Sequence, residues 1–151
     1  MITIVDATLD HARDLAPRLR AGDHTECVDL GVDPLEALEV GVRLSMYSWT
    51  ALDDGKPCAM WGIRPDDVMG QAARVWLLTG DAVARNRMAF LRHTKAWVAR
   101  VSDLYPVLYV FPSANYPEAL RLLRWLGFDL SPPGPCDRNG ALVHRAERGH
   151  V

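Results

Sequence analysis

The sequence predicts an α/β (α+β) protein with one domain, residues 1–151, built on a mixed, mostly antiparallel sheet with a central parallel β-α-β crossover and helices on both faces. Strand-like and helix-like segments follow one another in the order β-α-α-β-β-β-α-β-α-β-β, without a repeat or a linker. A long helix-like segment at 81–106 separates strand-like segments at 73–79 and 107–112. Such a unit closes as a right-handed crossover between parallel strands.

In the first half of the chain, residues 2–6 ("ITIVD") read as a strand, and residues 9–31 as a helix running into a polar bend. A second helix is expected at 34–45, where apolar residues fall near one face: Leu35, Leu38, Val42 and Leu44. Residues 47–63 contain two strand-like runs around "DDGK", which predicts a hairpin with Gly55 at positive φ. Trp49, Trp61 and Trp76 lie in strand-like runs and are expected in the core.

In the second half, the segment 81–106 carries an apolar stripe at helical spacing: Phe90, Leu91, Thr94, Trp97, Val98, Val101 and Leu104. The stretch "NYPEALRLLRWLGFDL" then predicts a helix with Pro117 in its first turn and one apolar face, formed by Leu120, Leu123 and Leu126. Gly127 stands just past that face, where a left-handed cap needs no Cβ. Two short strand-like runs, "FDLS" and "ALVHRA", end the fold.

Composition excludes several classes of function. The net charge of −2 lacks the excess of Lys and Arg that a broad nucleic-acid surface needs, so a nucleic-acid partner is not expected. No apolar run approaches the roughly 20 residues that span a bilayer, so we expect no membrane segment and a soluble, cytosolic protein. The three cysteines form no C-x-x-C pair, and the half-site His24/Cys27 has no second pair, so we expect neither disulfides nor a metal.

The element order and the ending of the last helix on Gly-Phe resemble the GNAT (Gcn5-related N-acetyltransferase) superfamily. A narrower resemblance rests on the segments "DHTECVDLG", "SMYSWTALDDGKPCAMWGI", "VWLLTGDA", "AFLRHTKAWV" and "LRWLGF". Together they resemble a family of short-tailed phage proteins, described as internal virion protein A-like or as phage acyltransferase.

The superfamily resemblance implies that acyl-CoA is held by its pyrophosphate on backbone N–H groups at a Q/R-x-x-G-x-G/A loop, between the fourth strand and the next helix. Here that stretch is "LTGDAVARNRMAF", and Met88 stands where a glycine is expected. We therefore expect either no cofactor or, if the protein is active, acetyl-CoA. The residues that would then hold it are Thr79, Gly80, Arg85, Asn86, Arg87 and Asn115. The alternative is a solvated basic first turn.

The resemblance also implies a tyrosine four residues before the glycine of Gly-Phe, but Leu123 occupies that position. Tyr116 is expected to be a cap or surface residue. The fourth strand lacks the Glu that often serves as general base in the superfamily. Asp23 and Glu26, three residues apart in the expected bend, are the best catalytic substitutes, although a pair of acids on a loop can simply be solvated. His93 is another conceivable base, and we expect it at the margin of the core.

Trp125 is expected on the polar face of the last helix, beside Arg121 and Arg124. Because Trp and Arg are enriched at binding hot spots, these three residues indicate a contact surface for a phage or host protein. The alternative is that Trp125 packs under a neighbouring loop.

Three functions remain open. The first, which we place ahead, is a phage GNAT-fold protein with degenerate catalysis that acts in virion assembly or genome delivery through protein contacts. The second is an acyl-CoA-dependent N-acyltransferase (acetyltransferase) acting on an amine of a protein or small molecule. The third is a phage regulator that binds a host protein. The resemblance places the protein in the host bacterial cytoplasm or within the virion.

Overall fold

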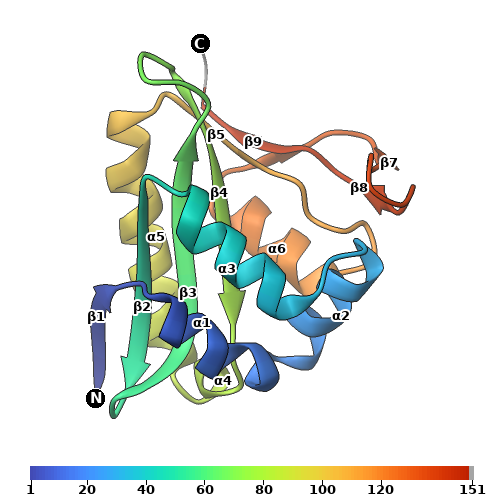
Figure 1. Ribbon diagram of the computed structural model, residues 1–151. Coiled ribbons are helices and arrows are strands. Elements are labelled where there is room, and N and C mark those ends of the chain that lie inside the picture. Colours follow the sequence, from blue (N-terminus) through green and yellow to red (C-terminus); the bar gives the residue numbers. More distant parts are fainter. Residues whose placement is uncertain (150–151) are drawn as a thin grey trace.

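A seven-stranded sheet forms the centre of the computed structural model, which describes residues 1–149 (Figure 1). The strand order is β1-β2-β3-β4-β5-β9-β6, and β7 pairs with β8 in a separate ribbon. The strands are β1 (Ile2–Asp6), β2 (Tyr47–Asp53), β3 (Lys56–Pro65), β4 (Ala72–Thr79), β5 (Val107–Val110), β6 (Asp129–Leu130), β7 (Gly134–Pro135), β8 (Leu142–Val143) and β9 (Ala146–Arg148). Only β4 and β5 are parallel, so the expected mixed, mostly antiparallel sheet is confirmed.

Helices cover both faces of the sheet, as expected (Figure 1). One face carries α1 (Leu9–Leu15), the 3₁₀ turn η1 (Ala16–Arg18), α2 (Ala21–Asp29) and α3 (Pro34–Leu44). The other carries α5 (Arg87–Leu104) and α6 (Pro117–Trp125), with the single turn α4 (Ala82–Arg85) leading from β4 into α5. Among the described residues, three clusters of buried side chains lie between these layers, the third around Ala51, Ala59 and Val83. Leu15, Leu38, Met60 and Leu78 belong to the first, and Val98, Val101, Leu108 and Phe128 to the second.

The parallel pairing of β4 and β5 is short, and this decides where the fold opens. Residues 72–74 of β4 pair with residues 107–109 of β5, as the predicted crossover requires. Beyond Arg74, β4 continues to Thr79 in pairing with β3 but not with β5. The two strands therefore part towards their carboxyl ends, and a gap opens in the middle of the sheet.

Local turn signals are confirmed. The β2–β3 hairpin turns at Asp54 (φ 49°) and Gly55 (φ 83°), two successive left-handed residues that match the right-handed twist of the flanking strands. The predicted cap of α6 is also present, since Gly127 has φ 93°. Its N–H donates to the Arg124 carbonyl (3.0 Å), and the N–H of Phe128 donates to the Leu123 carbonyl (2.9 Å). These two bonds form a Schellman motif, which satisfies the last carbonyls of the helix.

Three expectations about helices were wrong. The segment 9–31 is a broken run of α1, η1 and α2 rather than a helix and a bend, because Pro17 sits in the tight turn and Leu19 is extended. The segment 81–106 breaks at Asn86 (φ −117°, ψ 34°), which separates α4 from α5. Leu44 and Leu104 are 51% and 71% exposed, since each lies at the last residue of its helix, past the covered part of the sheet.

Burial of the tryptophans is less complete than expected. Trp49, Trp61 and Trp76 all face helices but keep part of their surface exposed. Trp49 stacks with Trp61 at 6.3 Å between ring centroids and meets Trp97 of α5 edge-on at 5.7 Å. In α6, Leu120 and Leu126 are buried while Leu123 is half-buried, so the expected apolar face is present.

The cap of α6 gives a direct test of this reading. Gly127→Val should lower the free energy of unfolding by roughly 1–2 kcal/mol, because a β-branched residue is strained in the left-handed region. Gly134→Val is the matched control, since Gly134 has ordinary φ, open space around it and a place in a strand. Urea unfolding of both variants measures the difference. Equal stability of the two variants would show that the left-handed cap does not constrain the chain.

Candidate functional site

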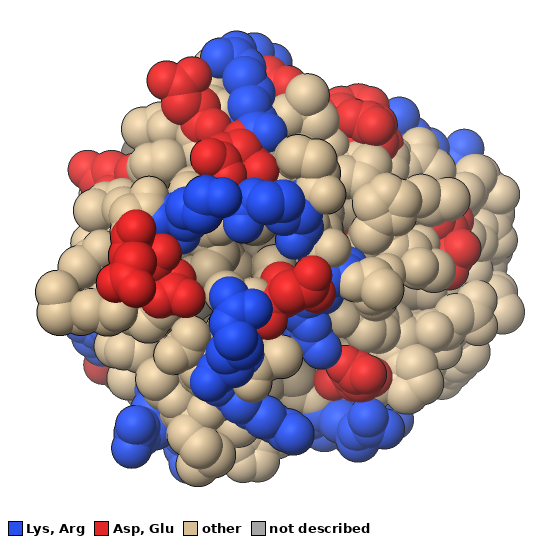
Figure 2. Space-filling model, turned by 90° about the horizontal axis from the view of Figure 1, so that it is seen from below, with Lys and Arg blue, Asp and Glu red and all other residues tan. Residues whose placement is uncertain are grey.

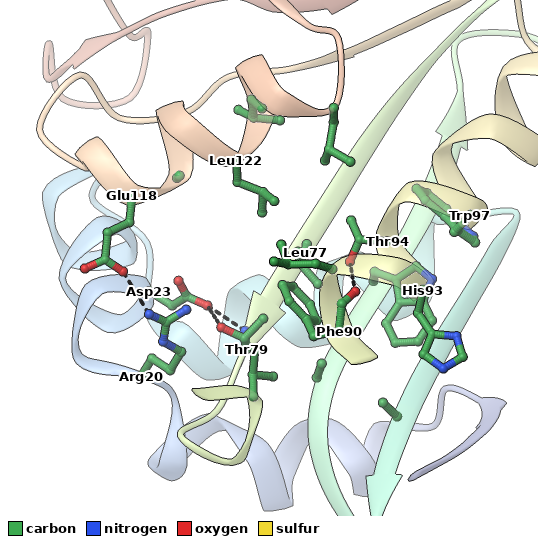
Figure 3. A pocket seen from close by; sticks show the side chains of 18 of the residues that line it. Arg20, Asp23, Leu77, Thr79, Phe90, His93, Thr94, Trp97, Glu118 and Leu122 are labelled. Carbon is green, nitrogen blue, oxygen red and sulfur yellow. Dashed lines mark hydrogen bonds and ion pairs between the residues drawn. The ribbon is translucent and has the colours of Figure 1, made fainter. Parts of the chain in front are cut away.

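A cleft of about 800 Å³ lies where β4 and β5 separate, between α5 and α6 (Figure 3). Its lining is mainly apolar, and a group of polar side chains lies at one end: Arg20, Asp23, Glu26, Thr79, Tyr116 and Glu118. Further polar side chains of the lining come from the start of α5 and from α6: Asn86, Arg87, His93, Thr94 and Arg121. Figure 3 shows Arg20, Asp23 and Glu118 on one side of the cleft, with Phe90, His93 and Thr94 on the other. A pocket of this size and lining is typical of a small-molecule site.

Asp23 is the most extensively bonded polar side chain of the cleft. It lies on α2, is 7% exposed, and its Oδ2 accepts both the N–H and the hydroxyl of Thr79, each at 2.6 Å. Its Oδ1 accepts the hydroxyl of Tyr116 at 2.6 Å. The predicted catalytic pair is therefore on a helix and points inward, and the expectation of a loop was wrong. Asp23 ties the end of β4 to the start of α6.

Glu26 lies one turn further along α2, on the same side of the helix as Asp23. Its Oε2 accepts the N–H of Ser113, just beyond β5, at 3.0 Å. Burial raises the pKa of the Glu26 carboxyl from its ordinary value of 4.5 to about 7, opposed by the Ser113 hydrogen bond and assisted by the charge of Asp23. A carboxyl that titrates near neutral pH is suited to act as a general base.

The expectation that Tyr116 is a cap residue is confirmed by its position, although its side chain makes no cap hydrogen bond. It precedes α6 at the cap position, but its ring turns into the cleft towards α2, and a Cβ at Gly22 would lie 2.6 Å from its hydroxyl oxygen. Burial, together with the hydrogen bond to Asp23, raises the pKa of the Tyr116 hydroxyl. The side chain therefore stays protonated at neutral pH. Beside it, Arg20 Nη2 pairs with Glu118 Oε2 at 2.8 Å, which closes the polar end of the cleft.

The backbone of β4 offers a hydrogen-bond donor to the opening. The N–H of Gly80 donates to the Cys58 carbonyl on β3, whereas the N–H of Thr79 points the other way, to Asp23. Since successive N–H groups alternate sides along a strand, the N–H of Leu77 also points away from β3. It lies beyond the last residue of β4 that pairs with β5, so it faces the gap.

The amino end of α5 borders the same cleft. The N–H of Phe90 donates to the Asn86 carbonyl, so the three residues 87–89 form the first turn, whose N–H groups have no acceptor within the helix. Arg87 and Ala89 line the cleft. Figure 2 shows the end of the molecule where β4 stops: a hollow lies there, with basic side chains around it and acidic ones between them. The helix dipole adds to the positive potential of this end.

The cleft brings together some of the predicted site residues but not others. Asp23, Glu26, Thr79, Asn86 and Arg87 all contribute to its lining. Three others do not: Gly80, Arg85 and Asn115. A Cβ at Gly80 would lie 3.1 Å from Leu15 Cδ1 and 3.2 Å from the Arg18 carbonyl oxygen, so this glycine allows a close approach of η1 rather than of a ligand.

Three residues of the polar end were missed as site residues by sequence reasoning: Arg20, Tyr116 and Glu118. A local sequence pattern could not reveal them, because the hydrogen bonds of Tyr116 and Arg20 join residues that are 93 and 98 positions apart in the chain. His93 is exposed and lines the cleft, as Phe90 and Trp97 do (Figure 3). Within residues 1–149, no helix is long and apolar enough to cross a membrane, and no three potential ligand side chains gather for a metal.

Several solved acetyltransferase structures are similar to this chain in fold. A phosphinothricin acetyltransferase of the GNAT superfamily from Sinorhizobium meliloti, in complex with AcCoA, superimposes with a TM-score of 0.66 at 17% identity, over 98% of this chain and 88% of that one. A GCN5-related N-acetyltransferase from Kribbella flavida gives 0.66 at 18% identity, over 99% and 98%. A chimera of the Vibrio cholerae spermidine N-acetyltransferase SpeG with hSSAT gives 0.70 at 10% identity, over 98% and 95%.

These similarities establish that the chain has the GNAT acetyltransferase fold. No protein-family model and no curated protein sequence matches the chain. The expected superfamily resemblance is thus confirmed at the level of fold, and the narrower phage resemblance stays a prediction.

The raised pKa of Glu26 has a consequence for stability. Between pH 4.5 and 7 the folded state binds more protons at Glu26 than the unfolded state, so the stability that this group contributes at low pH is lost as the pH rises through about 7. The free energy of unfolding should fall by at most about 1.4 kcal/mol per pH unit in this range. Urea unfolding across this range should show Glu26→Gln gaining stability relative to the unmodified chain.

Glu36→Gln is the control for that measurement, because Glu36 is an exposed carboxylate on α3. It should show no comparable rise. A Glu26→Gln difference that stays constant from pH 4.5 to 8 would mean that Glu26 ionises like a solvated side chain, and its candidacy as a base would lose its physical support.

Proposed function

We propose that this protein is an acyl-CoA-dependent N-acyltransferase that acetylates or acylates an amine. One observation carries the proposal. The cleft where β4 and β5 separate also contains the Glu26 carboxyl, whose pKa is raised to about 7. The neighbours with this fold support acyl-CoA as the donor, since two of the similar structures hold acetyl-CoA.

The residues of the cleft fit such a donor in spite of the missing glycines. Met88, at the expected glycine position, is 66% exposed and does not line the cleft, so its side chain does not fill the space beside the helix start. The N–H groups of the first turn of α5 and the side chain of Arg87 would hold the pyrophosphate. Among the expected cofactor residues, Thr79, Asn86 and Arg87 are retained in this proposal, and Gly80, Arg85 and Asn115 are not.

The donor, when bound, would supply a thioester whose carbonyl carbon accepts the amine. The N–H of Leu77 would donate to the carbonyl oxygen as charge develops on it. Glu26 would take a proton from the acceptor's ammonium group at Oε1, because its Oε2 is already bound to Ser113, and the neutral amine would then attack. Tyr116 has a protonated hydroxyl within the cleft, so it is the candidate to return a proton to the leaving sulfur, once its O–H turns from Asp23 to that sulfur. Leu123 has no hydroxyl and cannot donate this proton.

A second candidate function keeps the earlier expectation of protein contacts. Trp125 is 49% exposed, with Lys95 Nζ 5.2 Å from its ring centroid, and Arg121 and Arg124 are exposed beside it. This surface would suit a protein partner. A role in virion assembly or as a regulator rests on the sequence resemblance alone, and the structural neighbours favour acyl transfer over it.

Calorimetric titration with acetyl-CoA tests the proposal. We expect a micromolar dissociation constant, and about 10–100-fold weaker binding by Arg87→Ala, because a charge-assisted bond to phosphate is lost. Arg100→Ala is the control, since Arg100 is also an exposed arginine of α5 but lies outside the cleft. No binding at millimolar acetyl-CoA would refute the proposal and restore protein contact as the leading function.

A further inference from the structure

The cleft extends well beyond the space between β4 and β5. It continues beneath the amino-terminal half of α5, across β3 and β2, to the edge strand β1. This extension, called here the α5 lobe, has a mainly apolar lining: Ile2, Ile4, Ala51, Ala59, Val83 and Phe90. Polar side chains of α5, those of Arg87, His93 and Thr94, also line the cleft, while the acidic groups lie at its other end, around Asp23 and Arg20.

The floor of the α5 lobe is a row of small residues. In the sheet register, Thr79 of β4 stands opposite Ala59 of β3, which stands opposite Ala51 of β2, which stands opposite Ile4 of β1. Alanine is disfavoured in strands, where β-branched and aromatic side chains pack better. The row crosses three strand spacings, roughly 14 Å, from the polar end of the cleft to the sheet edge.

The two halves of α5 pack differently on the sheet. In the carboxyl-terminal half, Val98 and Val101 are 4% and 6% exposed and belong to a continuous buried cluster. In the amino-terminal half, Phe90 and Thr94 are only partly buried although they line the cleft. Because protein interiors pack at crystal-like density, an apolar space of this kind is a place for an apolar guest.

From this continuity we infer that the α5 lobe receives the hydrocarbon tail of the acyl group, so that the preferred donor is a medium-chain acyl-CoA rather than acetyl-CoA. The inference rests on the proposed function. Leu77 links the two parts, since its N–H faces the gap and its side chain packs against the lobe. A tail attached at the gap therefore enters the lobe directly. Burial of a hydrocarbon tail against this mainly apolar lining is favourable.

The far end of the lobe is open, since Ile4 on the edge strand is 42% exposed. A chain long enough to pass Ile4 emerges into solvent. The gain in affinity with chain length should therefore level off rather than reverse.

Calorimetric titration of the full chain with acetyl-, butyryl- and octanoyl-CoA, without an acceptor, tests the inference. Each buried methylene strengthens binding up to roughly fourfold, so octanoyl-CoA should bind at least about tenfold more tightly than acetyl-CoA. The double variant Ala51→Ile/Ala59→Val should lose this preference while binding acetyl-CoA within about twofold of the unmodified chain. Ala72→Ile, a strand substitution outside the cleft, should keep the preference.

Tryptophan fluorescence of the unmodified chain provides a second measurement, which does not require the Ala51→Ile/Ala59→Val variant to fold. Octanoyl-CoA should change the emission of the unmodified chain more than acetyl-CoA does, and Trp97→Phe should reduce that difference. Equal affinity and equal emission for the two thioesters would overturn the inference and leave the acyltransferase proposal standing. Failure of every thioester to bind would overturn both.

Discussion

A single buried carboxylate, that of Asp23, holds the open end of this fold together. The parallel ladder ends at Arg74, which leaves the last part of β4 without a partner on the β5 side. One Asp23 oxygen accepts hydrogen bonds from the N–H and the hydroxyl of Thr79, in place of an acceptor on β5. The other oxygen accepts a hydrogen bond from the Tyr116 hydroxyl. A buried carboxylate is tolerated only when such donors surround it. Through it, α2, β4 and α6 are fixed around a gap that backbone pairing alone would not maintain.

The same helix carries the group best placed for chemistry. Glu26 accepts a hydrogen bond from the N–H of Ser113, just beyond β5, and Asp23 accepts one from the N–H of Thr79, at the end of β4. Helix α2 therefore bridges the two strands where they separate. The two acids differ in environment: Asp23 receives three donors, whereas one of the Glu26 oxygens has none among residues 1–149. Asp23 thus serves mainly to position other groups, and Glu26 remains available to a proton. This division gives a physical reason for two acids at a spacing of three.

Local signals in the sequence predicted the frame and part of the site, since Asp23, Glu26 and Arg87 all line the cleft. Hydrophobic periodicity and turn chemistry located the crossover, the Gly55 hairpin and the Gly127 cap, because each depends on residues close together in the chain. The helical state of α2 was missed because its sequence, "AGDHTECVD", is stabilised by polar contacts with distant elements instead of an apolar stripe. The contact of the Tyr116 hydroxyl with Asp23 was missed for the same reason. The absent glycines and tyrosine suggested lost catalysis, yet the position of Leu123 says nothing about a hydroxyl reaching the cleft from elsewhere.

A crystal structure of the protein with acetyl-CoA would test the central claim most directly, namely that the gap between β4 and β5 is an acyl-donor site. The account predicts the thioester carbonyl oxygen within hydrogen-bond distance of the Leu77 N–H, and the pyrophosphate against the first turn of α5 beside Arg87. The carboxylates of Asp23 and Glu26 should keep their contacts with Thr79 and Ser113. A complex in which the ligand lies outside this gap, or in which β4 and β5 close and pair along residues 75–79, would contradict the account.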